Sequence, residues 1–340
     1  MNKKYQLGIV GCGDFLRWNV PALKASKHAV VRSLFDPATD RAAKFAAELG
    51  GSVADSAEAM FSDPEIDIVL LFVPPWIRTD LWLRAAAAGK HVLATKPLAN
   101  SAADCEKILA ASKKTRSGVL YGRSGDDWAE TVKRVLDGGE LGRLALYRQD
   151  WLHHYPQWNT WALDPVKNGG PFMDAMVHNL NLARYLMGRP LTGATFFSEK
   201  LAHPDLTCAD TEMLKAEFAG NGSALLFITW AADLAVHSTA GNDREHIDLF
   251  YLVTDQGWRI TKEWIDGNAT AVASRMGEKK SFPAQASGMN MFDQFAEAVD
   301  SGTPLPGNIV SPEMAADDIR LLRDLERRPG EHVTGIEFVS

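Results

Sequence analysis

Two hydrophobic patterns alternate along the first third of the chain. Short apolar runs of strand length, of which residues 66–73 (IDIVLLFV) are the clearest, are continuous, as expected for strands buried on both faces. Stretches with helical spacing separate them. We predict strands at 5–10, 30–35, 66–73, 91–94 and 119–121, and helices at 15–26, 41–49, 79–88 and 102–115. This alternation predicts a parallel sheet connected by right-handed crossovers.

After about residue 122 the predicted strands follow one another without intervening helices. Gly/Asn turns such as residues 220–222 join them, which indicates a largely antiparallel sheet. The predicted strands are 144–152, 193–201, 212–219, 224–232, 247–254 and 257–262, and the predicted helices are 128–136, 173–187, 289–301 and 312–327. We therefore expect an α/β protein with domains at 1–122 and 123–340, whose C-terminal helix is able to pack back on the first domain.

Composition limits the partners and the compartment. A length of 340 residues suits two domains, and 46% hydrophobic with 23% charged residues is typical of globular proteins. The net charge of −7 argues against nucleic acid. Cys12, Cys105 and Cys208 have no disulfide or metal spacing, which favours reduced thiols. The apolar run after Lys3 and Lys4 is too short for a signal peptide, and no later segment has membrane-helix length, so we expect a cytoplasmic protein without membrane contact.

A glycine loop separates the first predicted strand from the first helix. Gly11 and Gly13 permit a tight turn there and let backbone N–H groups approach a pyrophosphate at the helix N-terminus. Asp36 follows the second strand, where a carboxylate accepts hydrogen bonds from ribose hydroxyls and repels a 2′-phosphate, which favours NAD over NADP. A plain tight turn and a helix cap at Asp36-Pro37 are the alternative interpretations of these residues.

Two further segments resemble the Gfo/Idh/MocA oxidoreductase family. Residues 89–98 (GKHVLATKPL) are similar to its GKHVL-x-E-K-P segment, and residues 169–178 (GGPFMDAMVH) to its glycine-rich D-x-x-x-H helix start. The likeness extends to the Val73-Pro74 strand end, to residues 139–143 (GELGR) and to the terminal helix followed by residues 330–333 (GEHV). The resemblance implies an N-terminal Rossmann domain, doubly wound around a parallel sheet, and a C-terminal α/β domain with a large, mostly antiparallel open sheet. That second domain would bind substrate and form homodimers or homotetramers.

The chain departs from the family pattern at three positions. Thr95 replaces the glutamate of the EKP segment, Arg78 stands where the family often has histidine, and Leu16 replaces the third glycine of the loop. The expected cofactor contacts, for NAD in preference to NADP, are Gly11, Gly13, Asp14, Phe15, Asp36, Arg41, Val73, Pro74 and Lys96.

Oxidation of an alcohol requires a hydride acceptor, which a nicotinamide supplies, and a base. By the resemblance, His178 is the general base and Asp174 its electrostatic partner. Their spacing of four residues places both on one face of a helix, and Asn181 extends that face. Lys96, at a strand end where open α/β sheets bind ligands, can stabilise alkoxide character on the reacting oxygen. Structural alternatives are a solvated lysine and an exposed Asp/His pair.

The substrate is expected to be a carbohydrate or polyol. Residues 151–161 (WLHHYPQWNTW) combine tryptophans that stack on sugar rings with polar groups that bind hydroxyls. We predict substrate contacts from Lys96, Arg123, His153, Trp158, Asn159, Asp174 and His178. The alternative is that these aromatics pack in a core or an interface. Adjacent strand residues His153 and His154 point to opposite faces, so we predict no metal.

Three functions remain open on the sequence. The first is reversible hydride transfer between NAD(H) and a secondary alcohol or hemiacetal carbon of a sugar, sugar derivative or cyclitol. The second is an NAD-dependent glycosidase that oxidises a ring carbon transiently, eliminates the aglycone and reduces the carbon again. The third is a silent regulator that binds NAD or sugar. The presence of Lys96, Asp174 and His178 ranks the regulator last.

Overall fold

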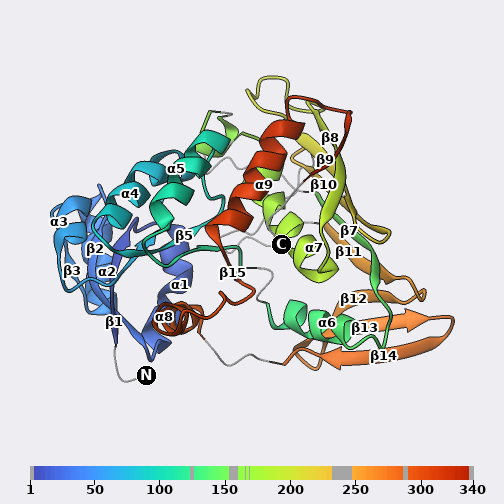
Figure 1. Cartoon of the computed structure of the whole chain (residues 1–340), viewed down its shortest axis with the longest axis horizontal. Helices are drawn as coiled ribbons and strands as arrows, with labels where there is room; N and C mark the ends of the chain where they lie inside the picture. The colour runs from blue at the N-terminus through green and yellow to red at the C-terminus, as the bar shows by residue number, and fades with distance from the viewer. Residues whose placement is uncertain are drawn as a thin grey trace. The chain divides into compact units, whose positions relative to one another are not determined.

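The chain forms two compact units (Figure 1). The computed structural model describes residues 4–122, 126–152, 160–164, 166–167, 169–231, 247–285 and 290–336. The first unit comprises Met1–Tyr121 and Gly288–Ile319, and the second comprises Gly122–Ser287 and Arg320–Ser340. Among the described residues, no helix is long and apolar enough to cross a membrane.

A seven-stranded sheet, counted over the described residues, organises the first unit. Its order is β15-β6-β5-β4-β1-β2-β3, and β1 to β6 are parallel, whereas β15 is antiparallel to β6. The strands are β1 (Tyr5–Val10), β2 (Ala29–Phe35), β3 (Ser52–Val53), β4 (Ile68–Leu71), β5 (His91–Thr95), β6 (Ser117–Leu120) and β15 (Ile309–Val310). This is the doubly wound order, with its switch point between β1 and β4.

Helices cover both faces of this sheet. On one face, α1, α2 and α8 join β1 and β2 in a core that includes Leu7, Leu16, Phe45 and Phe295. On the other, α3 and α4 contact the strands and α5 packs on α4. The helices are α1 (Asp14–Ala25), α2 (Thr39–Leu49), α3 (Ala57–Ser62), α4 (Pro75–Ala87), α5 (Ala102–Ser112) and α8 (Met291–Ser301). Leu16, at the position of the missing third glycine, is fully buried in that core.

The second unit is built on a nine-stranded sheet within the described residues. Its order is β14-β13-β12-β11-β7-β10-β9-β8-β16, and only the β7/β10 pair is parallel. The strands are β7 (Leu144–Leu152), β8 (Leu191–Glu199), β9 (Thr211–Phe218), β10 (Gly222–Thr229), β11 (Ile247–Thr254), β12 (Arg259–Ile265), β13 (Asn268–Arg275), β14 (Glu278–Pro283) and β16 (His332–Thr334). The predicted fold class, a parallel doubly wound sheet followed by a large antiparallel one, is confirmed.

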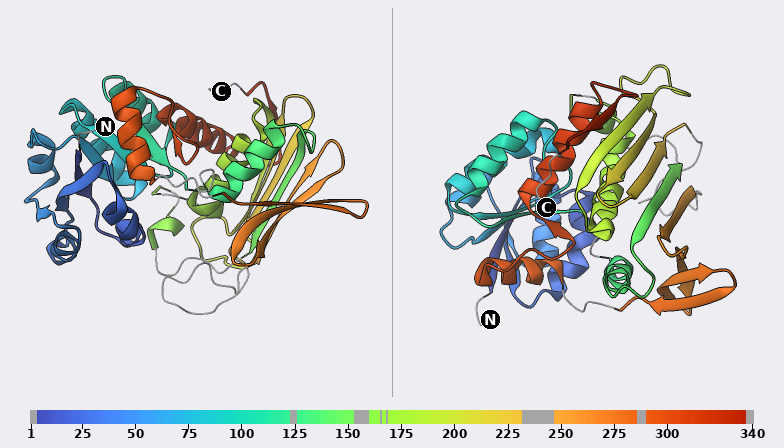
Figure 2. Two further views of the ribbon diagram at one scale, coloured as in Figure 1. Left: turned by 90° about the horizontal axis from the view of Figure 1, so that it is seen from below. Right: turned by 45° about the vertical axis from the view of Figure 1, so that its right-hand side comes forward.

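Helices lie along one face of the second sheet (Figure 2). α6 (Asp127–Asp137) contacts β13 and β14, and α7 (Val177–Met187) contacts β7 and β10. A short 3₁₀ helix, η1 (Thr160–Leu163), precedes a π-helical turn, η2 (Phe172–Met176), that runs directly into α7. α9 (Pro312–Leu325) begins in the first unit and ends in the second.

In the second unit, one hairpin was missed by the sequence analysis and one expected helix was wrong in detail. The hairpin of β13 and β14 was not predicted, because β14 (EKKSFP) is a polar edge strand without an alternating apolar face. The helix expected over 173–187 begins instead as the π turn η2, so its first residues do not follow 3.6-residue periodicity. Both differences lie in the second unit.

Candidate active site

The loop after β1 has the geometry of a phosphate cradle. Gly11 has φ +98°, and a Cβ there would lie 2.4 Å from the Phe72 carbonyl oxygen, so only glycine fits. Gly13 is the N-cap of α1, and a Cβ there would meet no atom within 4 Å. No side chain among the described residues caps this helix end. The first backbone amides of α1 therefore face open space and have no side-chain acceptor, which suits the pyrophosphate of a dinucleotide. These residues fit the NAD that the sequence implies.

Asp36 ties the glycine loop to the end of β2. One carboxylate oxygen accepts a hydrogen bond from the Cys12 amide, and the other accepts one from the Ala38 amide, both at 2.8 Å. The bond to Ala38 closes a local turn and is not the helix cap of the alternative interpretation, because the N-cap of α2 is Ala38 and no described side chain caps that helix. It does not exclude ribose binding, because each carboxylate oxygen can accept a second hydrogen bond. Burial, with a smaller contribution from the charge of Asp36, raises the pKa of the Cys12 thiol to about 12, and Arg41 opposes this shift. The thiol therefore stays protonated.

The other expected cofactor residues lie at the same carboxyl edge of the first sheet. Val73 and Pro74 follow β4, and Pro74 is the N-cap of α4. The Phe15 ring packs edge-on against Phe72, with centroids 4.9 Å apart. The side chains of Asp14 and Arg41 are exposed, on α1 and α2 respectively.

Lys96 follows β5 at this edge. Its amide donates to the Leu120 carbonyl at 3.2 Å, its side chain is half-buried, and the Lys96–Pro97 peptide is cis. Lys90, which directly precedes β5, has a different role at the other end of the strand. Its ammonium donates to the carbonyls of Asp63 and Ile66 at 2.6 and 2.8 Å, so it fixes a loop.

Asp174 and His178 lie on η2 and α7 of the second unit. The Asp174 amide bonds the Gly170 carbonyl at 3.2 Å, and both side chains are half-buried. Asp174 lies on the π turn, a feature that recurs at functional sites. Asn181, expected to extend the same polar face, is buried.

Glu212 on β9 supports this turn and was missed by sequence analysis. It is buried, accepts a hydrogen bond from the Phe172 amide at 2.7 Å, and accepts another from the Ser198 hydroxyl at 3.1 Å. A Cβ at Gly170 would lie 3.0 Å from its carboxylate. Burial raises the pKa of Glu212 to about 8. The signal available in the sequence was a carboxylate at a core-facing position, in register with Leu214 and Ala216 along the strand.

Several predicted residues cannot be placed. Arg123, His153, Trp158 and Asn159 lie outside the described residues, so their substrate contacts stay predictions. Within the described ranges, no group of three or more His, Cys, Asp or Glu side chains is suited to hold a metal ion. His153 and His154 lie outside the described residues.

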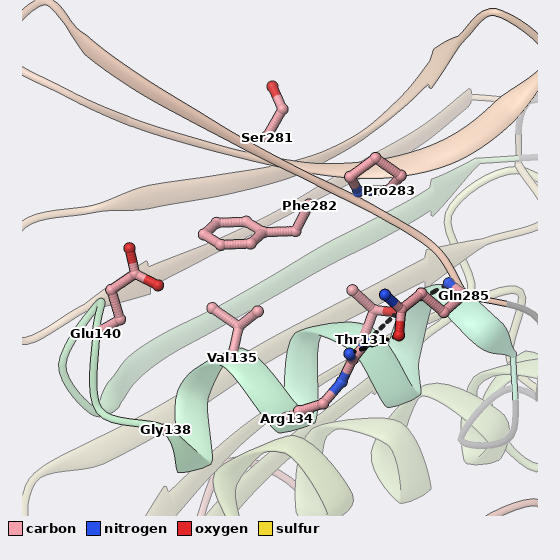
Figure 3. Close-up of a pocket in the computed structure, with 9 residues that line it drawn as sticks. All are labelled: Thr131, Arg134, Val135, Gly138, Glu140, Ser281, Phe282, Pro283 and Gln285. Atoms are coloured by element: carbon pink, nitrogen blue, oxygen red, sulfur yellow. Dashed lines mark hydrogen bonds between the residues drawn. The ribbon is translucent and has the colours of Figure 1, made fainter.

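A cavity of about 390 Å³ lies between α6 and β14 in the second unit (Figure 3). The Phe282 ring lies over Val135 inside it, and Arg134 bonds Gln285 at 2.7 Å beside them. None of the predicted site residues lines this cavity.

Comparison with known proteins follows the division into two units. Residues 5–122 match the oxidoreductase family with an NAD-binding Rossmann fold, and residues 129–242 match the GFO/IDH/MocA C-terminal domain. Together these family models span more than half of the chain.

Curated relatives and one solved structure add detail. The scyllo-inositol 2-dehydrogenase (NAD(+)) of Bacillus subtilis is 31% identical over 50% of this chain and 49% of its own. The myo-inositol 2-dehydrogenase of Thermotoga maritima is 27% identical over 54% and 55%. The chain thus matches about half the length of these relatives. The aldose-aldose oxidoreductase of Caulobacter crescentus has the same fold, with a TM-score of 0.83 at 20% identity over 98% of this chain and 100% of that one.

Proposed function

Because this chain belongs to the Gfo/Idh/MocA family of oxidoreductases, we propose that it transfers a hydride between NAD(H) and a sugar or cyclitol. The reacting atom is a secondary alcohol or hemiacetal carbon. The observation that carries the proposal is the carboxyl edge of the first sheet, where the open glycine loop, Asp36 and Lys96 follow three of its parallel strands. Two matched relatives named as inositol dehydrogenases support the class of substrate.

In this proposal the cofactor is held by the first unit. The amides at the start of α1 bind the pyrophosphate, and the space before Gly13 admits it. Asp36 binds the adenosine ribose and disfavours a 2′-phosphate, so NAD is preferred to NADP. Bound there, the nicotinamide supplies the hydride acceptor.

The chemical roles fall to three side chains. His178 takes the hydroxyl proton of the substrate, because an imidazole titrates near neutral pH. Asp174 stabilises the imidazolium that results. Lys96 donates a hydrogen bond to the reacting oxygen and stabilises its alkoxide character. Substrate binding would also involve Arg123, His153, Trp158 and Asn159.

A substrate panel tests the proposal. Purified protein is mixed with NAD⁺ or NADP⁺ and with aldoses, inositols, uronates and aryl glycosides, and both NADH and released aglycone are measured. The proposal expects reduced cofactor in proportion to substrate, and a Lys96→Met variant should lose it while Lys107→Met, an exposed lysine on α5, keeps it. Aglycone release without net NADH would instead indicate the glycosidase. Cofactor binding with no turnover across the panel would contradict both enzymes.

We also propose that the protein assembles as a homodimer or homotetramer through the second sheet. Leu249, Phe227, Met213 and Phe197 occupy one row across β11, β10, β9 and β8, with Asp150 of β7 between the first two. Three of the four apolar side chains are 38–47% exposed. An apolar row on an open sheet face favours cover by another subunit.

A further inference from the structure

Two of the positions at which the sequence departs from the family pattern are hydrogen-bonded to each other. The Arg78 guanidinium, on α4, donates through Nη2 to the Thr95 hydroxyl at 2.8 Å. The same nitrogen donates to the Val73 carbonyl, and Nη1 donates to the Pro97 carbonyl. One side chain therefore joins the end of β4 to the segment that follows β5.

The charge of this side chain is costly where it lies. Arg78 is 1% exposed, and no ion pair joins it to a carboxylate among the described residues. Burial lowers the pKa of its guanidinium to about 9, opposed by Tyr121 alone. Its Nε meets no acceptor in the described part of the chain. Carbonyl and hydroxyl oxygens compensate this charge only in part.

The contacts of Arg78 lie on both sides of Lys96. Thr95 precedes this lysine and Pro97 follows it, so the guanidinium holds the side-chain hydroxyl of one neighbour and the main-chain carbonyl of the other. We propose that Arg78, with Thr95 as its acceptor, is a positioning residue that sets the direction of the Lys96 ammonium. The inference rests on the proposed function, because it assumes that Lys96 acts beside the bound cofactor.

The same strand offers a matched control. Lys90 directly precedes β5, whereas Lys96 directly follows it. Lys90 is 7% exposed, and like Arg78 it donates hydrogen bonds to two main-chain carbonyls, those of Asp63 and Ile66. These contacts lie at the amino end of the strand, away from the edge where Lys96 lies. Removing the Lys90 hydrogen bonds should lower the stability of the protein and leave the position of the Lys96 ammonium unchanged.

The experiment measures the Lys96 amine directly and needs no substrate. Protein is acetylated with trace acetic anhydride, with and without NADH, and mass spectrometry compares Lys96 with the exposed Lys107. NADH should protect Lys96 in the wild-type protein. Thr95→Val removes the acceptor at nearly constant volume and should abolish this protection. Thr95→Ser, which keeps the hydroxyl, and Lys90→Met should both retain it.

Turnover provides a second measurement once the panel has given a substrate. Thr95→Val should lower kcat about tenfold, which corresponds to one hydrogen bond to a charged donor, with the KM for NAD unchanged. Calorimetry with NADH confirms that each variant is folded and loaded.

The possible results distinguish a failure of the Arg78 positioning role from a failure of the proposed function. Full protection and unchanged kcat in Thr95→Val would overturn the positioning role of the Arg78–Thr95 hydrogen bond and leave the proposed function standing. Equal loss of protection in Lys90→Met would show a general loosening of the unit and would also overturn it. An unprotected Lys96 in wild-type protein with NADH bound would contradict the function assigned to Lys96 itself.

Discussion

The carboxylate of Glu212 accepts a hydrogen bond from the Phe172 amide, 2.7 Å away, at the first residue of the π turn that carries Asp174. Glu212 lies on β9, and the π turn that it contacts leads into α7, the helix that carries His178. Burial is the largest cause of the raised pKa of Glu212. The negative charge of Glu326, in the terminal segment, also raises this pKa, whereas the positive charge of Arg323 lowers it. The turn is thus fixed by a group that prefers to be protonated at neutral pH.

Glu212→Gln should change how stability depends on pH. The folded pKa of about 8 lies above the ordinary value of 4.5, so stability is fully present below that ordinary value and falls as pH rises towards 8. The slope should reach about 1.4 kcal/mol per pH unit, which glutamine would remove, while its oxygen can still accept from the Phe172 amide and its NH₂ can donate to the Ser198 oxygen. Urea unfolding at pH 5 and pH 8 measures this. A stability difference from wild type that is the same at both pH values would contradict the buried-acid role.

Gly13→Ala should separate cofactor binding from folding. The backbone at Gly13 has φ −91° and ψ −160°, and an added Cβ meets nothing within 4 Å, so alanine should fold without strain. The methyl group would stand in the space proposed for the pyrophosphate. We expect the melting temperature to stay near wild type and NADH affinity to fall, as measured by calorimetry.

Gly11→Ala is the comparison for that variant. The Cβ of alanine at position 11 would collide with the Phe72 carbonyl, so Gly11→Ala should lower both the stability of the protein and its affinity for NADH. Undiminished NADH affinity in Gly13→Ala would place the pyrophosphate elsewhere.

Most of the first unit could be predicted from the sequence, because its buried parallel strands are short, mainly apolar runs bounded by turns, of which β4 (IVLL) is the clearest. The hairpin of β13 and β14 was missed because its two-residue turn is Met276-Gly277, which lacks the usual Asn-Gly or Asp-Gly sequence although both residues have positive φ. The π turn was beyond reach, since it depends on Glu212, which is distant in the chain. Lys96, Asp174 and His178 were found only through family resemblance.

Asp36→Ala should relax the choice between NAD and NADP. The carboxylate is expected to repel a 2′-phosphate, and Arg41 on α2 would then remain to attract one. Calorimetric titration should show wild type binding NAD at least about tenfold more tightly than NADP, and the variant much less selective. Equal or tighter binding of NADP by the wild-type protein would refute the role of Asp36.

That variant also loses a structural contact. Asp36 accepts amide hydrogen bonds from Cys12 and Ala38, so its removal should lower stability too. Asp36→Asn is the matched variant, because its amide oxygen can keep one of these bonds while the charge is lost. Selectivity that changes equally in both variants would assign the preference to charge.

Leu249→Asp should weaken self-association. Leu249 is 47% exposed and lies in one row with Met213 and Phe197 on the open sheet face. A charge there would have to be desolvated in an interface. Light scattering should show wild type as a dimer or larger and the variant as smaller. Met276→Asp, at an exposed hairpin turn, is the control and should not change the mass. A wild-type monomer of 37.3 kDa would exclude the proposed assembly.

His178→Ala tests the chemistry. If His178 takes the hydroxyl proton, its loss should lower kcat by roughly 10²–10⁴-fold, the usual contribution of a general base. NADH affinity should stay near wild type, because the glycine loop and Asp36 belong to the first unit and His178 to the second. The pH–rate profile of the variant should also lose the acidic limb, which a general base produces because it must be deprotonated to act.

The control for that variant lies one residue further along α7. Asn179 is buried, with its amide contacting the Met176 sulfur, so Asn179→Ala should cost stability without removing a proton acceptor. Comparing kcat of the two variants on the substrate from the panel separates loss of base from loosening of the helix. If His178→Ala kept most of its kcat while Lys96→Met lost it, the base would be Lys96, and the Arg78 contacts on either side of that lysine would set the geometry of proton transfer.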